Sequence, residues 1–410
     1  MASRKQTTHR RRSSSVALAL NQVPLNNQLQ AYQSSPEVKP LAGRSRPPTS
    51  DRFKSRGLLD DIKTNRWLLI PSSAFKLTLI VPCLYLLQLF FVQCSIIPPQ
   101  TFNLWEKLVF LSEKAEDGRY GKGWWDLLFV GNYIFFWTFV RQFMALKVLK
   151  PMAKSLGIKG GKVTRFTEQG YAVFYFGIMG VCGIYVMRGL PIWWYKTEFF
   201  WNTYPPRLMS LDLKAYYLLQ ASYWVQQMII MIAKIEKPRK DYTELICHHT
   251  VTLWLIGASY TVYLTYIGVA IFVTMDISDF FIGLAKCVNY VNEVASVPFL
   301  IWFTIVWTYM RHYLNLKILY SVLTQFSLIA VHERTNFNPF KDKWIDSWMQ
   351  WQIFIPILLL QILNLFWYAL IMRILVRAVM GWEIKDERSD DEDEGGEDEK
   401  EKVQEDTLGA

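Results

Sequence analysis

Two adjacent histidines and a pair of aspartates lie within apolar segments of the sequence. His248 and His249 belong to ELICHHTVTLWLIGASY, and Asp276 and Asp279 follow in IGVAIFVTMDISDFFIGLAK. Ionisable groups inside membrane helices are costly unless they are paired, hydrated or in functional use. A His–Asp pair in an apolar cavity supplies a general base whose imidazolium is stabilised as it forms. The sequence therefore predicts a buried catalytic site made of these four residues.

The chemistry that such a site favours is acyl transfer to an amine. An amine nucleophile is protonated near neutral pH and must lose its proton before it attacks; an imidazole can take that proton, or can accept the acyl group first. A basic link precedes the histidines, and its side chains could bind the phosphates of a coenzyme A thioester. These residues are Lys234, Lys237, Arg239 and Lys240. Basic residues beside a membrane helix are also ordinary topology signals, and that reading stays open.

The elements that must position the four residues are two helices joined as an antiparallel hairpin. Asp276 and Asp279 are three residues apart and share one helix face. With a turn centred on Thr265, His249 lies opposite about position 281, so Asp279 is roughly 3 Å and Asp276 roughly 8 Å from its level. We expect Asp279 to reach the histidines directly and Asp276 to act through water or substrate. Two other pairs are expected at the membrane interface without a role: Arg311-His312 and His332-Glu333.

The composition predicts an all-α polytopic membrane protein. Of 410 residues, 51% are hydrophobic, and apolar runs long enough to cross a bilayer recur along the chain. We expect about eight spans, with seven as the alternative, and six of the helices after residue 126 should surround a central cavity. The runs are 74–96, 126–147, 170–187, 213–233, 245–265, 267–290, 297–321 and 350–377. The predicted regions are a basic disordered segment (1–66), a first span with its link (67–125), a catalytic membrane domain (126–382) and an acidic disordered tail (383–410).

Charge predicts the orientation of the chain. Residues 1–66 carry 13 Lys/Arg against 4 Asp/Glu, whereas residues 383–410 carry 4 against 14. Basic links at 147–165 and 234–240 fall on the same side as both termini, which the positive-inside rule assigns to the cytosol. Such basic residues in a membrane protein indicate lipid and topology, not nucleic acid. No cleavable signal peptide is visible. In the terminal segments Ser15, Thr49 and Ser389 lie in sequence contexts that protein kinases favour, which predicts phosphorylation at these residues.

Other functions fit parts of this pattern. A purely structural role, a proton-coupled transporter and a metal site would each use buried His and Asp. Diiron membrane desaturases and hydroxylases carry many histidines in HxxxH and HxxHH boxes, whereas this chain has five in all, and no CxxC spacing indicates zinc. A transporter should show internal repeats, and none is evident. We therefore predict no metal and no redox cofactor.

The region around these residues resembles a known family. HHTVTLWLIGASY with MDISDFFIGLAKCVNY is similar to the signature of the ceramide synthases, within the membrane family named after the TLC domain, and EKPRKDYTELICHH, RHYLNLKILYSVLTQF and KDERSDDEDE resemble its fungal members. The resemblance covers about residues 60–395. It implies an endoplasmic reticulum enzyme that joins a fatty acyl group from acyl-CoA to the amine of a sphingoid base, forming ceramide.

The resemblance also implies roles and partners. His248 and His249 match the family's essential pair, and Asp276 and Asp279 match its acidic positions. Fungal relatives prefer very long acyl chains, form dimers with themselves or with a paralogue, and work with a small single-span regulatory subunit. The family's chain-length determinant maps to about 324–349. The alternative within the family is a non-catalytic lipid sensor or translocation helper, which would not need the four residues.

Overall fold

The fold was analysed in a computed structural model, which describes residues 54–233, 242–335 and 337–380. The described part is a bundle of helices, with isolated β-bridges but no β-strand among these residues. Each of the eight apolar runs forms a long helix, so the all-α prediction is confirmed. Five helices are long and apolar enough to cross a membrane, which makes the chain a multi-pass membrane protein. The five are Pro71–Gln93, Trp125–Ser155, Gly161–Arg188, Thr265–Val291 and Met349–Val376.

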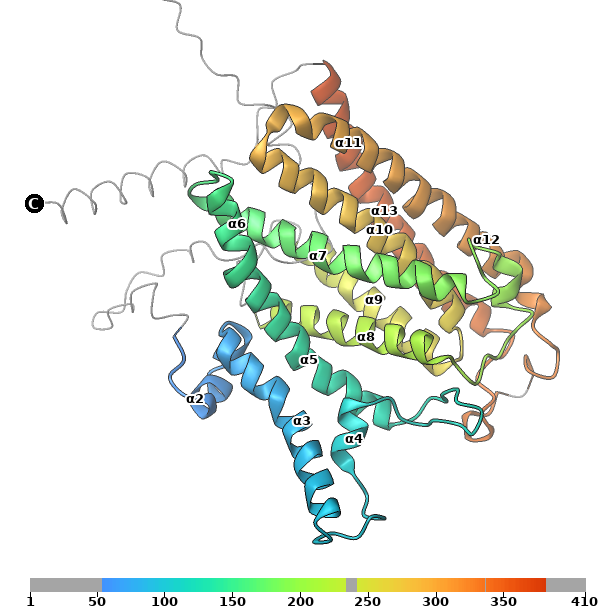
Figure 1. Ribbon diagram of the computed structural model, residues 1–410. Helices are drawn as coiled ribbons and strands as arrows, with labels where there is room; N and C mark the ends of the chain where they lie inside the picture. Colours follow the sequence, from blue (N-terminus) through green and yellow to red (C-terminus); the bar gives the residue numbers. More distant parts are fainter. Residues whose placement is uncertain (1–53, 234–241, 336, 381–410) are drawn as a thin grey trace, which may run out of the picture.

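The helices run alternately in opposite directions along the bundle (Figure 1). We call the end where α9 (Tyr242–Thr261) begins the histidine end, and the opposite one the far end. In chain order the long helices are α3 (Pro71–Gln93), α5 (Trp125–Phe143), α7 (Gly161–Arg188), α8 (Leu211–Ile232), α9, α10 (Thr265–Val291), α11 (Glu293–Trp307), α12 (Asn315–Gln325) and α13 (Met349–Met380). Shorter helices are α2 (Leu58–Lys63), α4 (Leu104–Val109) and α6 (Lys150–Ser155).

Two helices contain a π-helical segment. One, Met144–Leu149, joins α5 to α6, and the other, Thr308–Leu314, joins α11 to α12. A π-helical turn inserts an extra residue and changes the direction in which the following side chains point. The run predicted at 297–321 is therefore one helix with a shifted face in its middle, and this shift turns Arg311 into the bundle.

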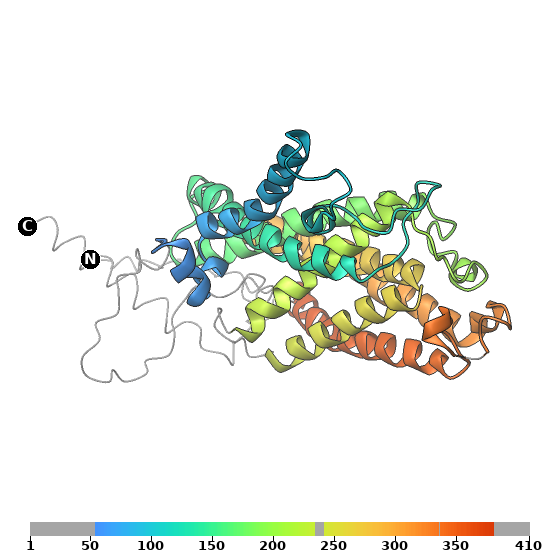
Figure 2. The same ribbon diagram turned by 90° about the horizontal axis from the view of Figure 1, so that it is seen from below.

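Helix α3 lies on the outside of the bundle, and α9 and α13 lie side by side along the opposite edge (Figure 2). α3 packs mainly against α5, and its apolar window is not buried by the protein. α10 is the most buried span, with α7 packed along one side of it. A methyl group added at Gly183 of α7 would lie 2.8 Å from Val273, so the missing side chain permits this close approach.

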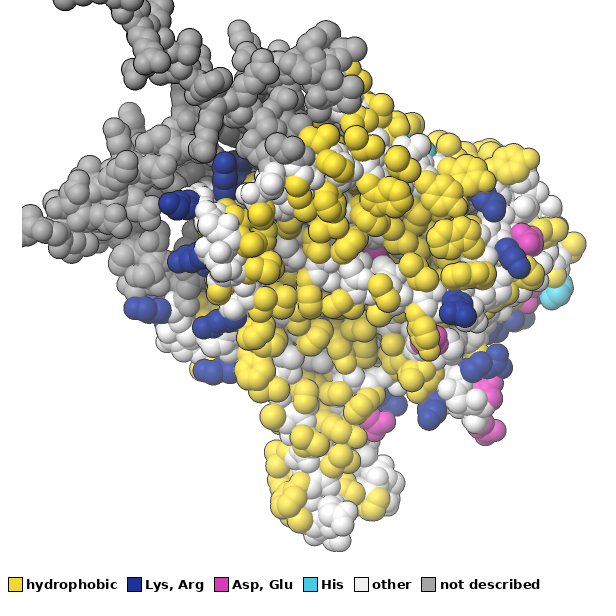
Figure 3. Space-filling model, turned by 45° about the horizontal axis from the view of Figure 1, so that its top comes forward, with side chains coloured by type: hydrophobic (Ala, Val, Ile, Leu, Met, Phe, Trp, Pro, Cys, Tyr) yellow, Lys and Arg dark blue, Asp and Glu magenta, His cyan; other side chains and the backbone are white. Residues whose placement is uncertain are grey.

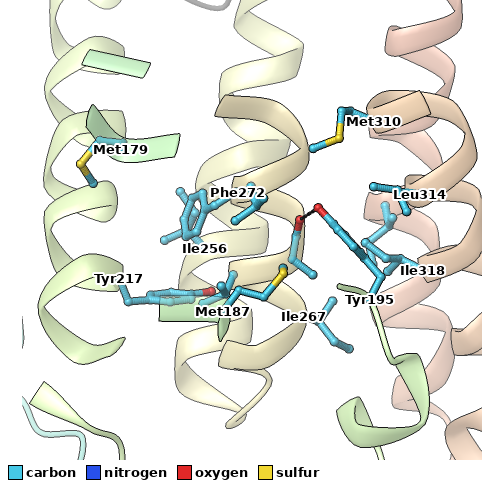
Figure 4. Close-up of a cluster of buried hydrophobic side chains, with 14 of the residues drawn as sticks. Met179, Met187, Tyr195, Tyr217, Ile256, Ile267, Phe272, Met310, Leu314 and Ile318 are labelled. Atoms are coloured by element: carbon cyan, nitrogen blue, oxygen red, sulfur yellow. Dashed lines mark hydrogen bonds between the residues drawn. The ribbon is translucent and has the colours of Figure 1, made fainter. Parts of the chain in front are cut away.

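The core between these helices is rich in aromatic and sulfur-containing side chains (Figure 4). Tyr217 of α8, Ile256 of α9 and Phe272 of α10 converge, and the hydroxyl of Tyr195 donates to the carbonyl oxygen of Ala270 at 3.1 Å. This bond anchors the loop after α7 to α10. The core therefore ties the histidine-bearing hairpin to its neighbours on both sides.

The surface divides into an apolar belt and two charged ends (Figure 3). At the histidine end exposed lysines stand on and beside α6, namely Lys147, Lys150, Lys154 and Lys159. At the far end the charges are mixed and paired: Arg207 lies 3.3 Å from Glu333 and 3.1 Å from Asp342. An apolar belt between polar ends is the surface that a bilayer requires.

Candidate active site

The four predicted catalytic residues are all buried within the bundle. His248 and His249 lie in the first half of α9, and Asp276 and Asp279 lie in the middle of α10. None is more than 1% exposed. The hairpin turn centres on Tyr263, whose φ is +63°, and not on Thr265. His249 then lies opposite about position 277, so both aspartates are close to its level.

The two histidines point to different neighbours, as adjacent residues on a helix must. The ring of His248 lies 5.3 Å from that of Trp367 on α13, and the ring of His249 lies 5.4 Å from that of Trp224 on α8. His249 Nδ1 lies 3.0 Å from the carbonyl oxygen of Leu245, which requires a proton on that nitrogen. The lone pair of a neutral His249 is therefore on Nε2.

His248 is held on one side only. Its Nε2 lies 3.3 Å from the hydroxyl of Thr252, one turn further along α9. Its Nδ1 is buried and has no hydrogen-bond partner among the residues that the structure describes. A buried nitrogen without a partner is costly in a resting protein and is typical of a site that binds or transforms a ligand.

Asp276 is held by polar side chains from the neighbouring α8. Gln220 Nε2 donates to its Oδ2 at 2.5 Å, and the hydroxyl of Tyr216 donates to the same oxygen at 3.3 Å. The hydroxyl of Tyr175 on α7 donates to Gln220 Oε1 at 2.8 Å and so orients the amide. This relay fixes the Asp276 carboxylate between three helices.

Asp279 is paired with an arginine that the sequence analysis placed at the membrane interface. Arg311 is 1% exposed, and its Nη2 lies 2.5 Å from Asp279 Oδ1. Its Nε donates to the hydroxyl of Ser278 at 2.6 Å, and its Nη1 donates to Asn364 Oδ1 at 3.1 Å. The guanidinium also lies 4.1 Å from the ring of Trp307. The interfacial prediction for Arg311 is therefore wrong.

The expected direct contact between Asp279 and the histidines is also absent. Within the described residues neither carboxylate is hydrogen-bonded to an imidazole. Asp279 instead accepts a hydrogen bond from Arg311, and Asp276 accepts one from Gln220 of α8. The groups still interact electrostatically: the charge of Arg311 acts on His248, and that of Asp279 on Asp276. Trp367, which contacts His248, lies one turn after Asn364, so α13 links Arg311 to the histidine.

A signal for Arg311 exists in the sequence. The residue lies in the middle of the apolar run 297–321, where the cost that singled out the histidines and aspartates applies equally to a guanidinium. His312 is half-buried, and its Nδ1 lies 2.8 Å from the side-chain amide of Gln361. The other expected interfacial pair, His332 and Glu333, does lie at the surface of the far end.

An apolar cavity extends from His248 toward the far end. Its volume is about 580 Å³, and α8, α9, α10 and α13 supply most of its wall. Of the four predicted residues, His248 lines the cavity. The wall continues along α9 to Thr261 and into the turn at Leu264, and Phe337, Trp344 and Trp348 complete it at the far end. A long hydrocarbon chain with its reactive end at His248 matches this shape and polarity.

A charged hub fixes the loops at the far end of the cavity. Asp342 accepts hydrogen bonds from Trp344 Nε1 at 2.8 Å, from the Tyr263 hydroxyl at 2.9 Å and from Arg207 Nε at 3.1 Å. Burial alone would raise the pKa of Asp342, but these hydrogen bonds hold it below the ordinary value. Lys122 lies 3.9 Å from the carboxylate and 3.5 Å from the Tyr263 ring, and burial lowers its pKa to about 8.

Several predicted residues lie outside the described part of the chain. They are the four basic residues Lys234, Lys237, Arg239 and Lys240 and the three phosphorylation candidates Ser15, Thr49 and Ser389. Among the described residues, no three His, Cys, Asp or Glu side chains come together as ligands for a metal ion. The site that the structure presents is therefore a histidine pair, two oriented carboxylates and one buried arginine.

Comparisons with known proteins agree with these features. The TLC-domain family profile matches residues 165–373, which include all four predicted residues and Arg311. The chain is 42% identical to sphingosine N-acyltransferase lac1 of Schizosaccharomyces pombe, over 69% of this chain and 73% of the relative. It is also 42% identical to ceramide synthase LAG1 of Saccharomyces cerevisiae, over 69% of each chain. This chain therefore belongs to the TLC-domain family, alongside the fungal sphingosine N-acyltransferases.

Proposed function

We propose that this protein is a ceramide synthase, an acyltransferase that moves a long fatty acyl group from acyl-CoA to the amine of a sphingoid base. The observation that carries the proposal is the position of His248, buried at one end of an apolar cavity. The cavity holds a hydrocarbon tail and places its reactive end against an imidazole. The names of the relatives support the same activity.

The reaction breaks the thioester C–S bond and forms an amide C–N bond. The ammonium of the base must lose two protons in all: the coenzyme A thiolate takes up one, and the other passes through an imidazole to water. In the first route the Nδ1 lone pair of His248, with Nε2–H donating to Thr252, attacks the thioester and forms an acyl-imidazole, which the amine then cleaves. In the second route the same nitrogen only removes the amine proton.

The neighbouring groups assist by position and charge. His249, with its Nε2 lone pair, accepts a proton or orients the amine. Asp276 and Asp279 supply negative charge that stabilises a developing imidazolium or the ammonium of the incoming base. Arg311 is a positioning residue: it pairs with Asp279 and fixes the distance between α10 and α13. None of these steps requires a metal or a redox cofactor.

Both substrates are amphipathic, which explains a site inside the membrane. The coenzyme A head group remains in water at the histidine end, where Lys234, Lys237, Arg239 and Lys240 bind its phosphates. The acyl tail extends toward Phe337, Trp344 and Trp348, within the segment 324–349 that contains the family's chain-length determinant. The distance from His248 to these three residues would then contribute to the preferred length of the acyl chain.

The surface charges support an orientation with both termini in the cytosol. Exposed lysines gather at the histidine end, as the positive-inside rule requires of a cytosolic face (Figure 3). The predicted regions 1–66, 67–125, 126–382 and 383–410 fit this arrangement, with three helices beyond the five apolar ones completing eight spans. We place the protein in the endoplasmic reticulum membrane, as a homodimer or a heterodimer with a paralogue, together with a small single-span regulatory subunit. Ser15, Thr49 and Ser389 would be modified on the cytosolic side.

The activity is tested with the purified protein and its copurifying subunits in detergent. We expect labelled sphingoid base and acyl-CoA to give an N-acyl product, and His248→Ala to lower turnover by about 100- to 10,000-fold, the range for loss of a general acid–base or nucleophilic group. An unchanged elution volume and melting temperature would show that the variant is folded. Wild-type complex that makes no N-acyl product would favour a lipid sensor or a transporter.

Intact-mass measurement then separates the two routes. Incubation with acyl-CoA alone should add one acyl group to wild type and none to His248→Ala if the acyl-imidazole forms. An unmodified wild type that still makes product would assign His248 to general-base catalysis. Near-normal turnover by His248→Ala would contradict both routes.

A further inference from the structure

One face of α9 is both part of the cavity wall and exposed at the surface of the protein. Trp254, Gly257 and Thr261 line the cavity, and all three are exposed. Their spacing of three and four residues places them on one stripe of the helix. Across from this stripe, Trp348 and Gln352 at the start of α13 also line the cavity and are also exposed. We call the opening between these five residues the side window.

The opposite wall of the cavity is closed. Ile267, Phe272 and Met275 of α10 face the cavity and are 3%, 5% and 5% exposed. Near the histidine end α9 and α13 meet through His248 and Trp367. The cavity is therefore closed toward α10, and its exposed lining residues lie in its far half, between α9 and the start of α13.

The depth of the cavity is short compared with a very long acyl chain. Thirteen residues of α9 separate His248 from Thr261, which is about 20 Å along the helix. Carbon–carbon bonds of about 1.5 Å in an extended zigzag advance roughly 1.25 Å per carbon, so this depth holds about 16 carbons. Gly257 lies about 13 Å from His248, which is the depth of about 11 carbons.

Gly257 leaves a gap at the centre of the window. A Cβ placed there would meet no other atom within 4 Å, so the wall of α9 is open at this residue. Trp254 and Trp348, 56% and 51% exposed, stand on the two sides of the opening. The side chains that line the cavity are mostly apolar, which suits a saturated chain crossing from the protein into the bilayer.

We propose that the side window at Gly257 lets the distal part of acyl chains too long for the cavity pass from the cavity into the bilayer. The proposal rests on the proposed acyltransferase function and adds how one site accepts chains of different length. Chains of about 16 carbons fit inside, whereas longer ones place their last carbons among the lipids, where they keep an apolar surrounding. A long chain then does not have to displace Trp344 at the far end of the cavity.

The test is Gly257→Phe, assayed with two competing acyl-CoAs: one of about 16 carbons, which matches the cavity depth, and one of about 26 carbons, which exceeds it by about 10. We expect the ratio of long to short ceramide to fall by at least about tenfold, the lower range of steric discrimination in an apolar pocket. Turnover of the shorter chain, which also passes Gly257 but ends inside the cavity, should fall less than turnover of the longer chain. The control is Gly131→Phe on α5, where an added Cβ also meets nothing within 4 Å and which does not line the cavity.

Three outcomes would overturn the window. An unchanged ratio would show that long chains do not pass Gly257. An equal loss of turnover with both acyl-CoAs would show that Phe blocks the cavity itself, because both acyl chains follow the same path as far as Gly257. In a second measurement, a photoreactive group on the last carbons of the long chain should label lipid and Trp254; labelling confined to Phe337 and Trp344 would place the last carbons at the far end of the cavity. If the wild-type protein were inactive with both acyl-CoAs, the proposed acyltransferase function would be refuted, which is a different result from those that overturn the side window.

Discussion

At the scale of residues, the site depends on one buried ion pair. Arg311 donates hydrogen bonds to Asp279 and Ser278 on α10 and to Asn364 on α13. Burying two charges is costly, and their attraction offsets the cost only when the remaining donors are also satisfied. Because three of its nitrogens find acceptors, Arg311 compensates the Asp279 carboxylate within the apolar interior.

Removing the arginine alone should destabilise the protein strongly. Arg311→Met leaves a buried carboxylate without its cation and should cost about 3–5 kcal/mol of unfolding free energy. Arg311→Lys keeps the charge but lacks the planar fork that reaches Ser278 and Asn364 together, so turnover should fall while most stability remains. Melting temperature and turnover of the detergent-purified protein check both.

The double variant Arg311→Met/Asp279→Asn provides the control. It removes both charges and should recover much of the stability lost in Arg311→Met, without recovering activity. If the double variant were no more stable than Arg311→Met, the ion pair would not be the source of the loss. If Arg311→Lys had full turnover, the positioning role would be wrong.

The four buried ionisable residues could be singled out from the sequence, but the side chains that hold Asp276 could not. His248, His249, Asp276 and Asp279 stand out because ionisable groups are rare in apolar runs. The relay from Tyr175 through Gln220 to Asp276 joins α7, α8 and α10, which pack together only in the folded bundle. No local pattern encodes such contacts.

At the scale of elements, hydropathy located the helices and missed their polar buried ends. The run expected at 170–187 is part of α7, which begins at Gly161. Its first turns contain Glu168 and Gln169, which are buried by the protein and not by lipid. Hydropathy cannot distinguish a polar residue that faces a helical partner from one in water. It likewise gave no sign of the π-helical turn that directs Arg311 inward.

The loops at the far end provide a pH-dependent test. Folded Lys122 loses its proton near pH 8, whereas an unfolded lysine keeps it until about pH 10.5. Between these values the unfolded state binds more protons, so the contribution of Lys122 to the unfolding free energy rises with pH. We expect the melting temperature of wild type relative to Lys122→Met to increase from pH 7 to pH 10. A constant difference would show that Lys122 is not titrating at the hub.

At the scale of the whole molecule, the apolar belt separates a lysine-rich end from an end of paired charges. This asymmetry, together with the position of His248 at one end of the cavity, puts the reactive end of the acyl chain near the same face as the basic residues. The coenzyme A head group, in water, and the acyl tail, in the membrane, then meet at one site. The architecture matches the physical state of both substrates.

The orientation is checked with engineered glycosylation acceptors. In the proposed orientation the far end faces the lumen, so an Asn-X-Ser/Thr sequence placed in the turn at 331–335 should be glycosylated and one placed at 157–159 should not. A glycosidase-sensitive gel shift reports each result. Modification at 157–159 alone would invert the proposed orientation.

The pairing of Asp279 with Arg311 also has a consequence for how the chain is made. α10 carries two carboxylates, each of which costs several kcal/mol at the centre of a bilayer when the helix is alone. Its neutralising arginine emerges from the ribosome about thirty residues later, in the next helix of the chain. α10 must therefore be retained beside the translocon, or sheltered by already inserted helices, until its counterion arrives. Variants that lose Arg311 would fail first during biosynthesis, as nascent chains removed by quality control.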